Sequence, residues 1–200
     1  MSILQHMILV LASVLTLYPV LWVIKIALDP SEGLSTDLSV VSQEVSLNNF
    51  KFILFEQPFF TWLLNSAIIS ISTTLIGVLL ACTAAYAFSR FRFPGRSAGL
   101  ISFLVTQMFP GTLMLIPLYI ILEKLHLLDR IAGLVFVYST TAIPFCVWIL
   151  KGYFDTIPKD LEEAARVDGA STFTIFWRIM MPLARPVIAI TALFSFMTAW

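Results

Sequence analysis

The chain has 200 residues, of which 59% are hydrophobic and only 12% are charged, and its twelve Lys and Arg balance its twelve Asp and Glu. Soluble globular domains carry about 25% charged residues, so a soluble fold of this size could not cover its apolar surface. The composition also excludes a disordered chain, a collagen-like chain and a disulfide scaffold. The zero net charge gives no basic excess that would indicate nucleic-acid binding. We therefore expect lipid to be the solvent.

The few cysteines and histidines limit the chemistry that the chain could support. Cys82 and Cys146 lie inside long apolar runs without CxxC spacing or a neighbouring His, so we expect buried thiols and neither a disulfide nor a metal site. His6 and His126 lie near the ends of apolar runs, and the sequence has no HExxH or GxSxG motif. We therefore predict no catalytic and no metal-ligating residues.

Four runs without Asp, Glu, Lys or Arg are long enough to cross a bilayer, which takes about 20 helical residues. A fifth begins at Pro186 and is still short of a full span at Trp200, so we expect the sequence to be truncated there. The first run lacks the basic start and the cleavage site of a signal peptide, so an uncleaved helix is the better interpretation. We predict an all-α polytopic membrane protein, a single domain over residues 1–200. The expected spans are 3–24, 62–88, 97–122, 131–150 and the incomplete 186–200.

The connections between these runs differ in their content of Lys and Arg. The second and fourth connections hold eight of the twelve basic residues, and the short segment Arg90–Arg96 holds three arginines and no acid. The positive-inside rule places these two connections in the cytoplasm. We therefore predict a multi-pass protein of the cell membrane with a cytoplasmic N-terminus and with the 29–61 region outside.

Small and polar residues recur inside the predicted spans. Thr73, Gly77, Ala81 and Ala85 form a small-residue stripe, which favours close helix packing or, alternatively, a subunit interface. The third and fourth spans contain polar residues and prolines but no buried charge, which argues against a proton- or ion-coupled transporter. A neutral polar solute such as a sugar would suit such a lining, although packing explains it equally well. The candidate substrate-pathway residues are Gln107, Pro110, Thr140 and Thr141.

The connection at residues 155–182 has its own predicted structure. Pro158 favours a helix start, acidic residues crowd the first turns, and Gly169 is typical of a left-handed cap, so we predict a helix over about 158–168. Leu161 and the two alanines at 164 and 165 give one side of it a low apolar surface. Ser171 is expected to cap a second, aromatic-rich stretch. A solvated connector would explain such a helix as well.

This connection closely follows a known signature, EAA-x3-G-x9-I-x-L-P. The matching residues are Glu163, Ala164, Ala165, Gly169, Ile179 and Pro182. Met181 stands where the pattern has Leu, which is a volume-conserving change. The signature resembles that of the inner-membrane permease subunits of binding-protein-dependent ABC importers.

The resemblance extends over nearly the whole chain and is strongest to the carbohydrate branch, close to the smaller maltose/maltodextrin permease subunit. The other segments that carry it are 65–66, 84–88, 90–96, 107–110, 143–145 and 151–154. It implies a type I ABC transmembrane domain, whose loop 155–182 couples to an ATPase. The residues that it assigns to this coupling are Leu161, Glu162, Glu163, Ala164, Ala165, Asp168 and Gly169.

The sequence has no GxxxxGK[ST] phosphate loop, so we expect a transport subunit and not an ATPase. The resemblance implies a separate ABC ATPase dimer that binds ATP and Mg, a second homologous permease subunit, an extracytoplasmic solute-binding protein and a sugar substrate. It also implies alternating access, in which closure of the ATPase dimer draws the short helices together. The alternatives are an ABC permease for a non-sugar solute and a stand-alone channel or membrane scaffold.

Overall fold

The computed structural model describes residues 3–29 and 45–200, and all secondary structure within them is helical. The chain divides into two compact units, residues 1–63 and 64–200. In the first unit, α1 (Ile3–Leu28) is followed by α2 (Asn48–Lys51) and a short π-helix, η1 (Phe52–Glu56). The amide of Asn49 donates to the carbonyls of Ala27 and Asp29, at 3.3 and 2.9 Å, so a side chain satisfies carbonyls that the end of α1 leaves free.

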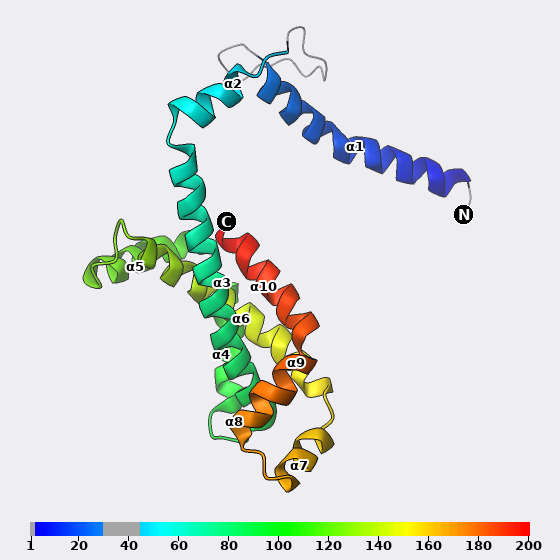
Figure 1. Ribbon diagram of the computed structural model, residues 1–200, viewed down its shortest axis with the longest axis vertical. Coiled ribbons are helices and arrows are strands. Elements are labelled where there is room, and N and C mark those ends of the chain that lie inside the picture. The colour runs from blue at the N-terminus through cyan, green and yellow to red at the C-terminus, as the bar shows by residue number, and fades with distance from the viewer. Residues whose placement is uncertain (1–2, 30–44) are drawn as a thin grey trace. The chain divides into compact units, whose positions relative to one another are not determined.

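The second unit contains the long helices that the apolar runs predict. They are α3 (Phe59–Arg90, which begins in the first unit), α6 (Ile131–Thr156) and α10 (Arg185–Ala199). Between α3 and α6 lie α4 (Arg96–Met108) and α5 (Gly111–Lys124). Between α6 and α10 lie α7 (Asp160–Val167), α8 (Thr172–Ile175), η2 (Phe176–Met180) and α9 (Met181–Leu183) (Figure 1).

The core of this unit lies where α3 and α6 meet the segment from α8 to α10. Small residues of α3 leave room for the larger Leu150 and Phe154 of α6, and both of these side chains are inaccessible to solvent. Ile175 and Met180 close the core from the α8 side. Both cysteines are free and buried in it, as the sequence predicts.

The predicted small-residue stripe of α3 is covered by the chain itself. Thr73, Gly77, Ala81 and Ala85 are all buried. A methyl group added at Gly77 would lie 3.6 Å from Ser195 Oγ of α10, so the small side chains allow α10 to approach closely. The stripe therefore serves packing within this chain.

The predicted third span, 97–122, is not one continuous helix. It is divided into α4 and α5, which are bent by 107° at a short break. Phe109 has an extended backbone there, because proline disfavours the helical conformation of the residue before it, and Pro110 is also non-helical, with ψ 130°. Pro117, by contrast, lies inside the uninterrupted α5.

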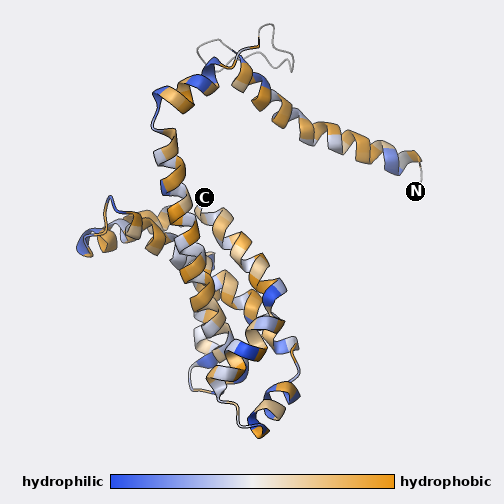
Figure 2. Ribbon diagram, in the orientation of Figure 1, coloured by the Kyte–Doolittle hydropathy of each residue, from blue (hydrophilic) through white to orange (hydrophobic). Residues whose placement is uncertain are grey.

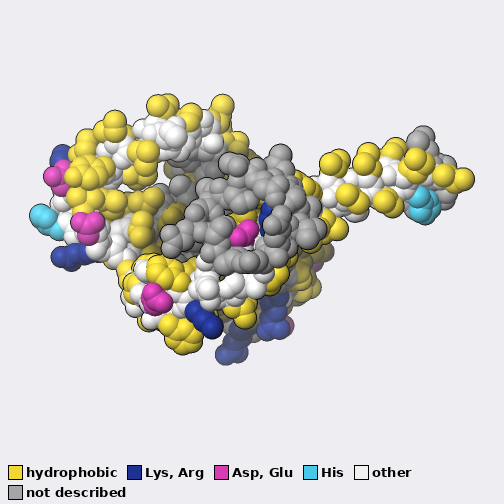
Figure 3. Space-filling view, turned by 90° about the horizontal axis from the view of Figure 1, so that it is seen from above, with side chains coloured by type: hydrophobic (Ala, Val, Ile, Leu, Met, Phe, Trp, Pro, Cys, Tyr) yellow, Lys and Arg dark blue, Asp and Glu magenta, His cyan; other side chains and the backbone are white. Residues whose placement is uncertain are grey.

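The described surface is mainly hydrophobic. Figure 2 shows that α1 and α10 are apolar over most of their length, and Figure 3 shows many hydrophobic side chains on the described part of the face that it draws. Among the described residues, α1, α3 and α6 are long and apolar enough to cross a membrane, and two bent pairs, α4–α5 and α8–α10, would also qualify if each is one span. A multi-pass membrane protein requires such lipid-facing surfaces.

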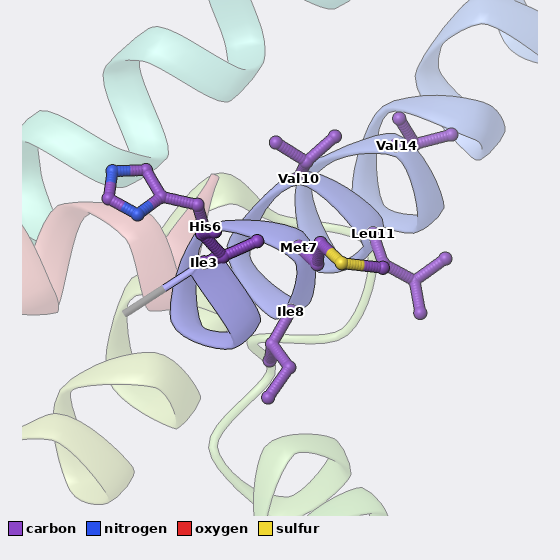
Figure 4. A pocket seen from close by; sticks show the side chains of 7 residues that line it. All are labelled: Ile3, His6, Met7, Ile8, Val10, Leu11 and Val14. Carbon is purple, nitrogen blue, oxygen red and sulfur yellow. The ribbon is translucent and has the colours of Figure 1, made fainter. Parts of the chain in front are cut away.

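A hollow of about 810 Å³ along α1 is lined by this helix alone (Figure 4). Six of its seven lining residues are hydrophobic, and the seventh is His6. Side chains from one helix do not enclose a polar ligand, so we assign this hollow to the apolar surface of α1.

Candidate coupling site at α7

The sequence predicts a helix at about 158–168, and α7 is observed at Asp160–Val167. It ends in a Schellman motif, in which the N–H of Gly169 donates to the Arg166 carbonyl at 3.0 Å and the N–H of Ala170 to the Ala165 carbonyl at 2.9 Å. Gly169 has φ +83°, a left-handed conformation that glycine adopts without strain. The glycine cap is therefore confirmed.

The next short helix is capped as the sequence predicts. Ser171 is the N-cap of α8, and its Oγ accepts a hydrogen bond from the Thr174 N–H at 3.2 Å. Trp177 and Phe173 follow, both exposed, in contact with each other at a ring-centroid distance of 6.2 Å. The segment after α7 thus has a fixed start and an aromatic surface.

The seven residues predicted to couple to an ATPase divide between two sides of α7. Glu162 and Ala165 face the chain's own core, and Glu162 is only 2% exposed. The others remain exposed, as does Val167 at 87%. The exposed members of the predicted set are Leu161, Glu163, Ala164, Asp168 and Gly169. A partner could therefore contact one side of α7 only.

The carboxylate of Glu162 is the centre of a buried polar cluster. It forms an ion pair with Arg90 at the end of α3, and the two side chains are 2% and 4% exposed. It also accepts a hydrogen bond from the Tyr86 hydroxyl at 2.9 Å, and the half-exposed Arg166 lies 3.5 Å away. Removing one partner of such a buried pair leaves an uncompensated charge, at a cost of about 3–5 kcal/mol.

Arg90 binds more than the carboxylate. While its Nε donates to Glu162, its Nη2 donates to the Ile157 carbonyl at 2.8 Å and its Nη1 to Ser89 Oγ at 3.2 Å. The planar guanidinium supplies donors in several directions at once. One side chain therefore joins the end of α3, the link between α6 and α7, and α7 itself.

A second polar layer continues from this cluster to the end of α6. Ser89 Oγ donates to Asp155 Oδ1 at 2.6 Å, and Asp155 also forms an ion pair with Lys151 one turn earlier. The polar ends of α3 and α6 are thus bound to each other beside α7.

The ring of Tyr86 holds its hydroxyl in place. It contacts the rings of Phe91, Phe154 and Phe176 at centroid distances of 5.7, 6.1 and 5.0 Å. Such edge-on and tilted aromatic pairs stabilise a side chain beyond the effect of its buried area. Tyr86 therefore connects the apolar core to the Glu162 carboxylate.

Sequence reasoning assigned Glu162 to the ATPase contact, and it assigned no role to Arg90, Tyr86 or Asp155. A signal was present, because Arg90 and Asp155 are charged residues close to the ends of long apolar runs. A charge that borders a membrane span and is buried, as Arg90 is, has to find a partner. The identity of the partner follows only from the tertiary contacts.

The same contacts bear on the topology. Because Arg90 and Ser89 contact Glu162, Ile157 and Asp155, the second and fourth connections lie together at one end of this unit. The arginine distribution placed both on one side of the membrane, which agrees with this arrangement.

The candidate substrate-pathway residues are only partly brought together. Gln107 Nε2 donates to the Thr141 carbonyl at 3.1 Å, which links α4 to α6. The hydroxyls of Thr140 and Thr141 bond to carbonyls of their own helix, and Pro110 is exposed at the α4–α5 break. Thr140 lines a groove of about 560 Å³ between α3 and α6 whose lining is mainly hydrophobic. The geometry does not single out a polar solute site among these four residues.

An all-helical fold with long apolar helices, and with the EAA signature on a short helix between two of them, is the architecture of a membrane transport permease. Residues 74–200 match the family described as binding-protein-dependent transport system inner membrane component. The chain belongs to this family, whose members are transport subunits and not themselves catalytic.

Relatives of known name extend the match to nearly the whole chain. The maltodextrin transport system permease protein MalD of Streptococcus pneumoniae is 35% identical over 97% of this chain and 69% of its own length. The trehalose transport system permease protein SugB of Mycobacterium tuberculosis is 35% identical over 92% of this chain and 67% of its own length. The expected resemblance to carbohydrate permeases is confirmed by these relatives.

A solved structure agrees with the fold. A chain in the crystal structure of a bacterial ABC transporter involved in the import of the acidic polysaccharide alginate has a TM-score of 0.84 and 23% sequence identity. The match covers 99% of this chain and 70% of that chain. At this identity the likeness shows the fold, and it confirms the predicted all-α ABC permease architecture.

Proposed function

We propose that this chain is a permease subunit of an ATP-driven importer that moves an oligosaccharide across the cytoplasmic membrane, with a maltodextrin as the first candidate. The names of the relatives support the substrate class, because both relatives described above are named for sugar transport. The hydroxyl and amide groups in residues 97–108 and 131–150 suit a neutral solute, since no charged residue lies in these stretches.

The coupling to ATP is proposed to occur through the exposed side of α7. The observation that carries this is that the helix with the EAA signature presents Leu161, Ala164 and Val167 to solvent while its inward side is fixed to the core. An exposed apolar ridge with the small Ala164 at its centre allows a partner to approach closely. The partner is an ABC ATPase dimer, which holds ATP and Mg and carries out the hydrolysis.

The complete transporter contains two further kinds of chain. The family description itself refers to a binding protein, so an extracytoplasmic solute-binding protein delivers the sugar. A second, homologous permease subunit completes the membrane part. ATP binding draws the two coupling helices together and changes the spans from inward-open to outward-open, and hydrolysis resets them. The positive-inside distribution supports a cytoplasmic location of α7 and of the N-terminus.

Site-directed cross-linking tests the partner. Ala164→Cys places a thiol on the exposed side of α7, and Leu125→Cys places one at the exposed end of α5, which is predicted to lie outside. With a thiol-to-amine reagent on intact membranes, we expect a cross-linked ATPase from Ala164→Cys and none from Leu125→Cys. Labelling of α7 from outside the cell, or no ATPase adduct, would contradict the proposal and favour a stand-alone channel or scaffold.

Uptake measurements test the substrate and the coupling surface. Cells that carry the whole transporter should accumulate labelled maltodextrin, whereas uptake of a non-sugar solute would identify the other kind of ABC permease. Ala164→Glu alters the exposed ridge and should abolish uptake while the protein still inserts. Ala165→Glu is a poorer test than its neighbour, because Ala165 packs against the chain's own core.

A further inference from the structure

The ion pair between Arg90 and Glu162 joins two segments that lie 72 residues apart in the sequence. We propose that this pair is a permanent joint that passes each movement of α7 directly to the end of α3. Arg90 is then a positioning residue for coupling. The inference rests on the function proposed above, because it takes α7 to be the contact with the ATPase.

Without this joint, α7 would be connected to the rest of the unit mainly by its own chain. The link before α7 contains Pro158 and leads to α6, and the link after it contains Gly169 and leads to α8. A force applied to α7 would therefore reach α6 and α8 first, and α3 only through side-chain packing and the single hydrogen bond from the Tyr86 hydroxyl. The guanidinium of Arg90 provides a direct connection to α3.

The burial of the pair indicates that it stays closed. Opening it would separate two charges at a site where both side chains are almost inaccessible to solvent, and it would leave Glu162 with only the longer ion pair to Arg166. Arg166 also forms an ion pair with the carboxylate, but at 3.5 Å and with a side chain that is 48% exposed, so it compensates the buried charge less well than Arg90 does. The Tyr86 hydroxyl, fixed by three neighbouring rings, holds the same carboxylate from a second direction. Movement of α7 as a body with the end of α3 keeps every one of these bonds.

The joint requires an arginine and not merely a positive charge. Arg90 directs three different nitrogens at Glu162, Ile157 and Ser89. A lysine presents all its donors on a single nitrogen, so it can keep the charge but cannot reach the three acceptors together. Arg90→Lys therefore keeps the positive charge but loses the simultaneous bonds to the three acceptors, so it tests the joint and not the charge.

Distance measurement between spin labels tests the joint without relying on transport. Labels at Arg92→Cys and Ala164→Cys, both exposed positions, report on the end of α3 and on α7. We expect one narrow distance distribution in the parent, and a distribution about twice as wide in Arg90→Lys. Tyr86→Phe, which keeps the ring packing and removes only the hydroxyl, should broaden it less. A distribution that stays narrow in Arg90→Lys would overturn the proposal.

The spin-label measurement needs a background without native cysteines and a control substitution, and this chain offers both. The buried Cys82 and Cys146 are replaced by alanine so that only the introduced thiols are labelled. Arg178→Lys makes the same exchange at an exposed arginine of η2 and should leave the distribution unchanged. If it broadens the distribution as much as the exchange at Arg90 does, the effect is not specific to the joint and the proposal is wrong.

A covalent link in place of the ion pair tests whether the pair stays closed during transport or has to open. In the assembled transporter, Arg90→Cys with Glu162→Cys should lower uptake about tenfold while ATP hydrolysis continues, because charge-assisted bonds are lost. A bifunctional thiol reagent that spans the two positions should restore uptake. Inactivation by the reagent would show that the pair has to open. If the parent transports no sugar, the proposed function fails, and the spin-label result still decides the joint.

Discussion

Gly169 allows a prediction whose size follows from the backbone alone. Its φ is +83°, and a methyl group added to it would meet no atom within 4 Å. Gly169→Ala therefore introduces strain and no clash. The left-handed conformation costs an L-residue roughly 1–2 kcal/mol, which lowers the population of the capped end of α7 by about five- to thirtyfold. The two hydrogen bonds of the Schellman motif depend on this conformation.

Gly95 provides a matched control. It has φ +85° at the start of α4 and also has no atom within 4 Å of an added methyl group, so Gly95→Ala introduces the same strain outside α7. Both alanine variants should lower the thermal unfolding midpoint by about 2–8 °C. Gly169→Asn should retain most of the stability, since asparagine tolerates this conformation.

The assay is ATP-driven sugar uptake by the assembled transporter in proteoliposomes, expressed per amount of complex. Because α7 is proposed to contact the ATPase, Gly169→Ala should lower uptake about five- to thirtyfold, whereas Gly95→Ala should not change it. Equal losses in the two variants would refute the reasoning. So would unchanged uptake in Gly169→Ala together with the expected thermal shift.

Three further substitutions test the structure itself. Gly133→Ala would place a methyl group 2.2 Å from the Leu127 carbonyl oxygen, so the backbone has to shift, and denaturant titration in micelles should show a loss of about 1–3 kcal/mol. Ser171→Ala removes the acceptor for the Thr174 N–H and should cost about 0.5–2 kcal/mol in the same titration. Asn49→Ala removes the amide that donates to the last carbonyls of α1, and we expect faster amide hydrogen exchange at the end of that helix.

Gly152→Ala is the matched control for Gly133→Ala. Gly152→Ala adds a methyl group in open space without a positive φ, so it should be neutral or slightly stabilising. Equal stability of the Gly133→Ala and Gly152→Ala variants would contradict the packing at the start of α6. For the caps, unchanged stability of Ser171→Ala, or unchanged exchange in Asn49→Ala, would show that the hydrogen bond contributes nothing.

The elements were largely predictable because their signals are local. Apolar runs long enough to cross a bilayer correspond to α1, α3 and α6. The acidic first turn and the glycine cap correspond to α7 and its Schellman motif. The break between α4 and α5 was harder to predict, because Pro110 and Pro117 look alike in sequence and only the first of them interrupts the helix.

The division of α7 into an inward and an outward side could not be read from the sequence. Glu162 and Glu163 are adjacent and chemically identical, and both suit the positive end of a helix dipole. One is buried against Arg90 and Tyr86, and the other is exposed. Helical periodicity shows which residues share a side, but it does not show which side faces the chain.

Span length and helix capping depend on residues close together in the chain, so the amino-acid sequence alone was enough to predict a helical membrane permease and to locate its short helix with the EAA signature. Only the folded chain shows which residues of that helix are available to a partner and which bind the end of α3. Those roles depend on a buried carboxylate finding a guanidinium that lies far away in the sequence, and only the folded packing brings the two together.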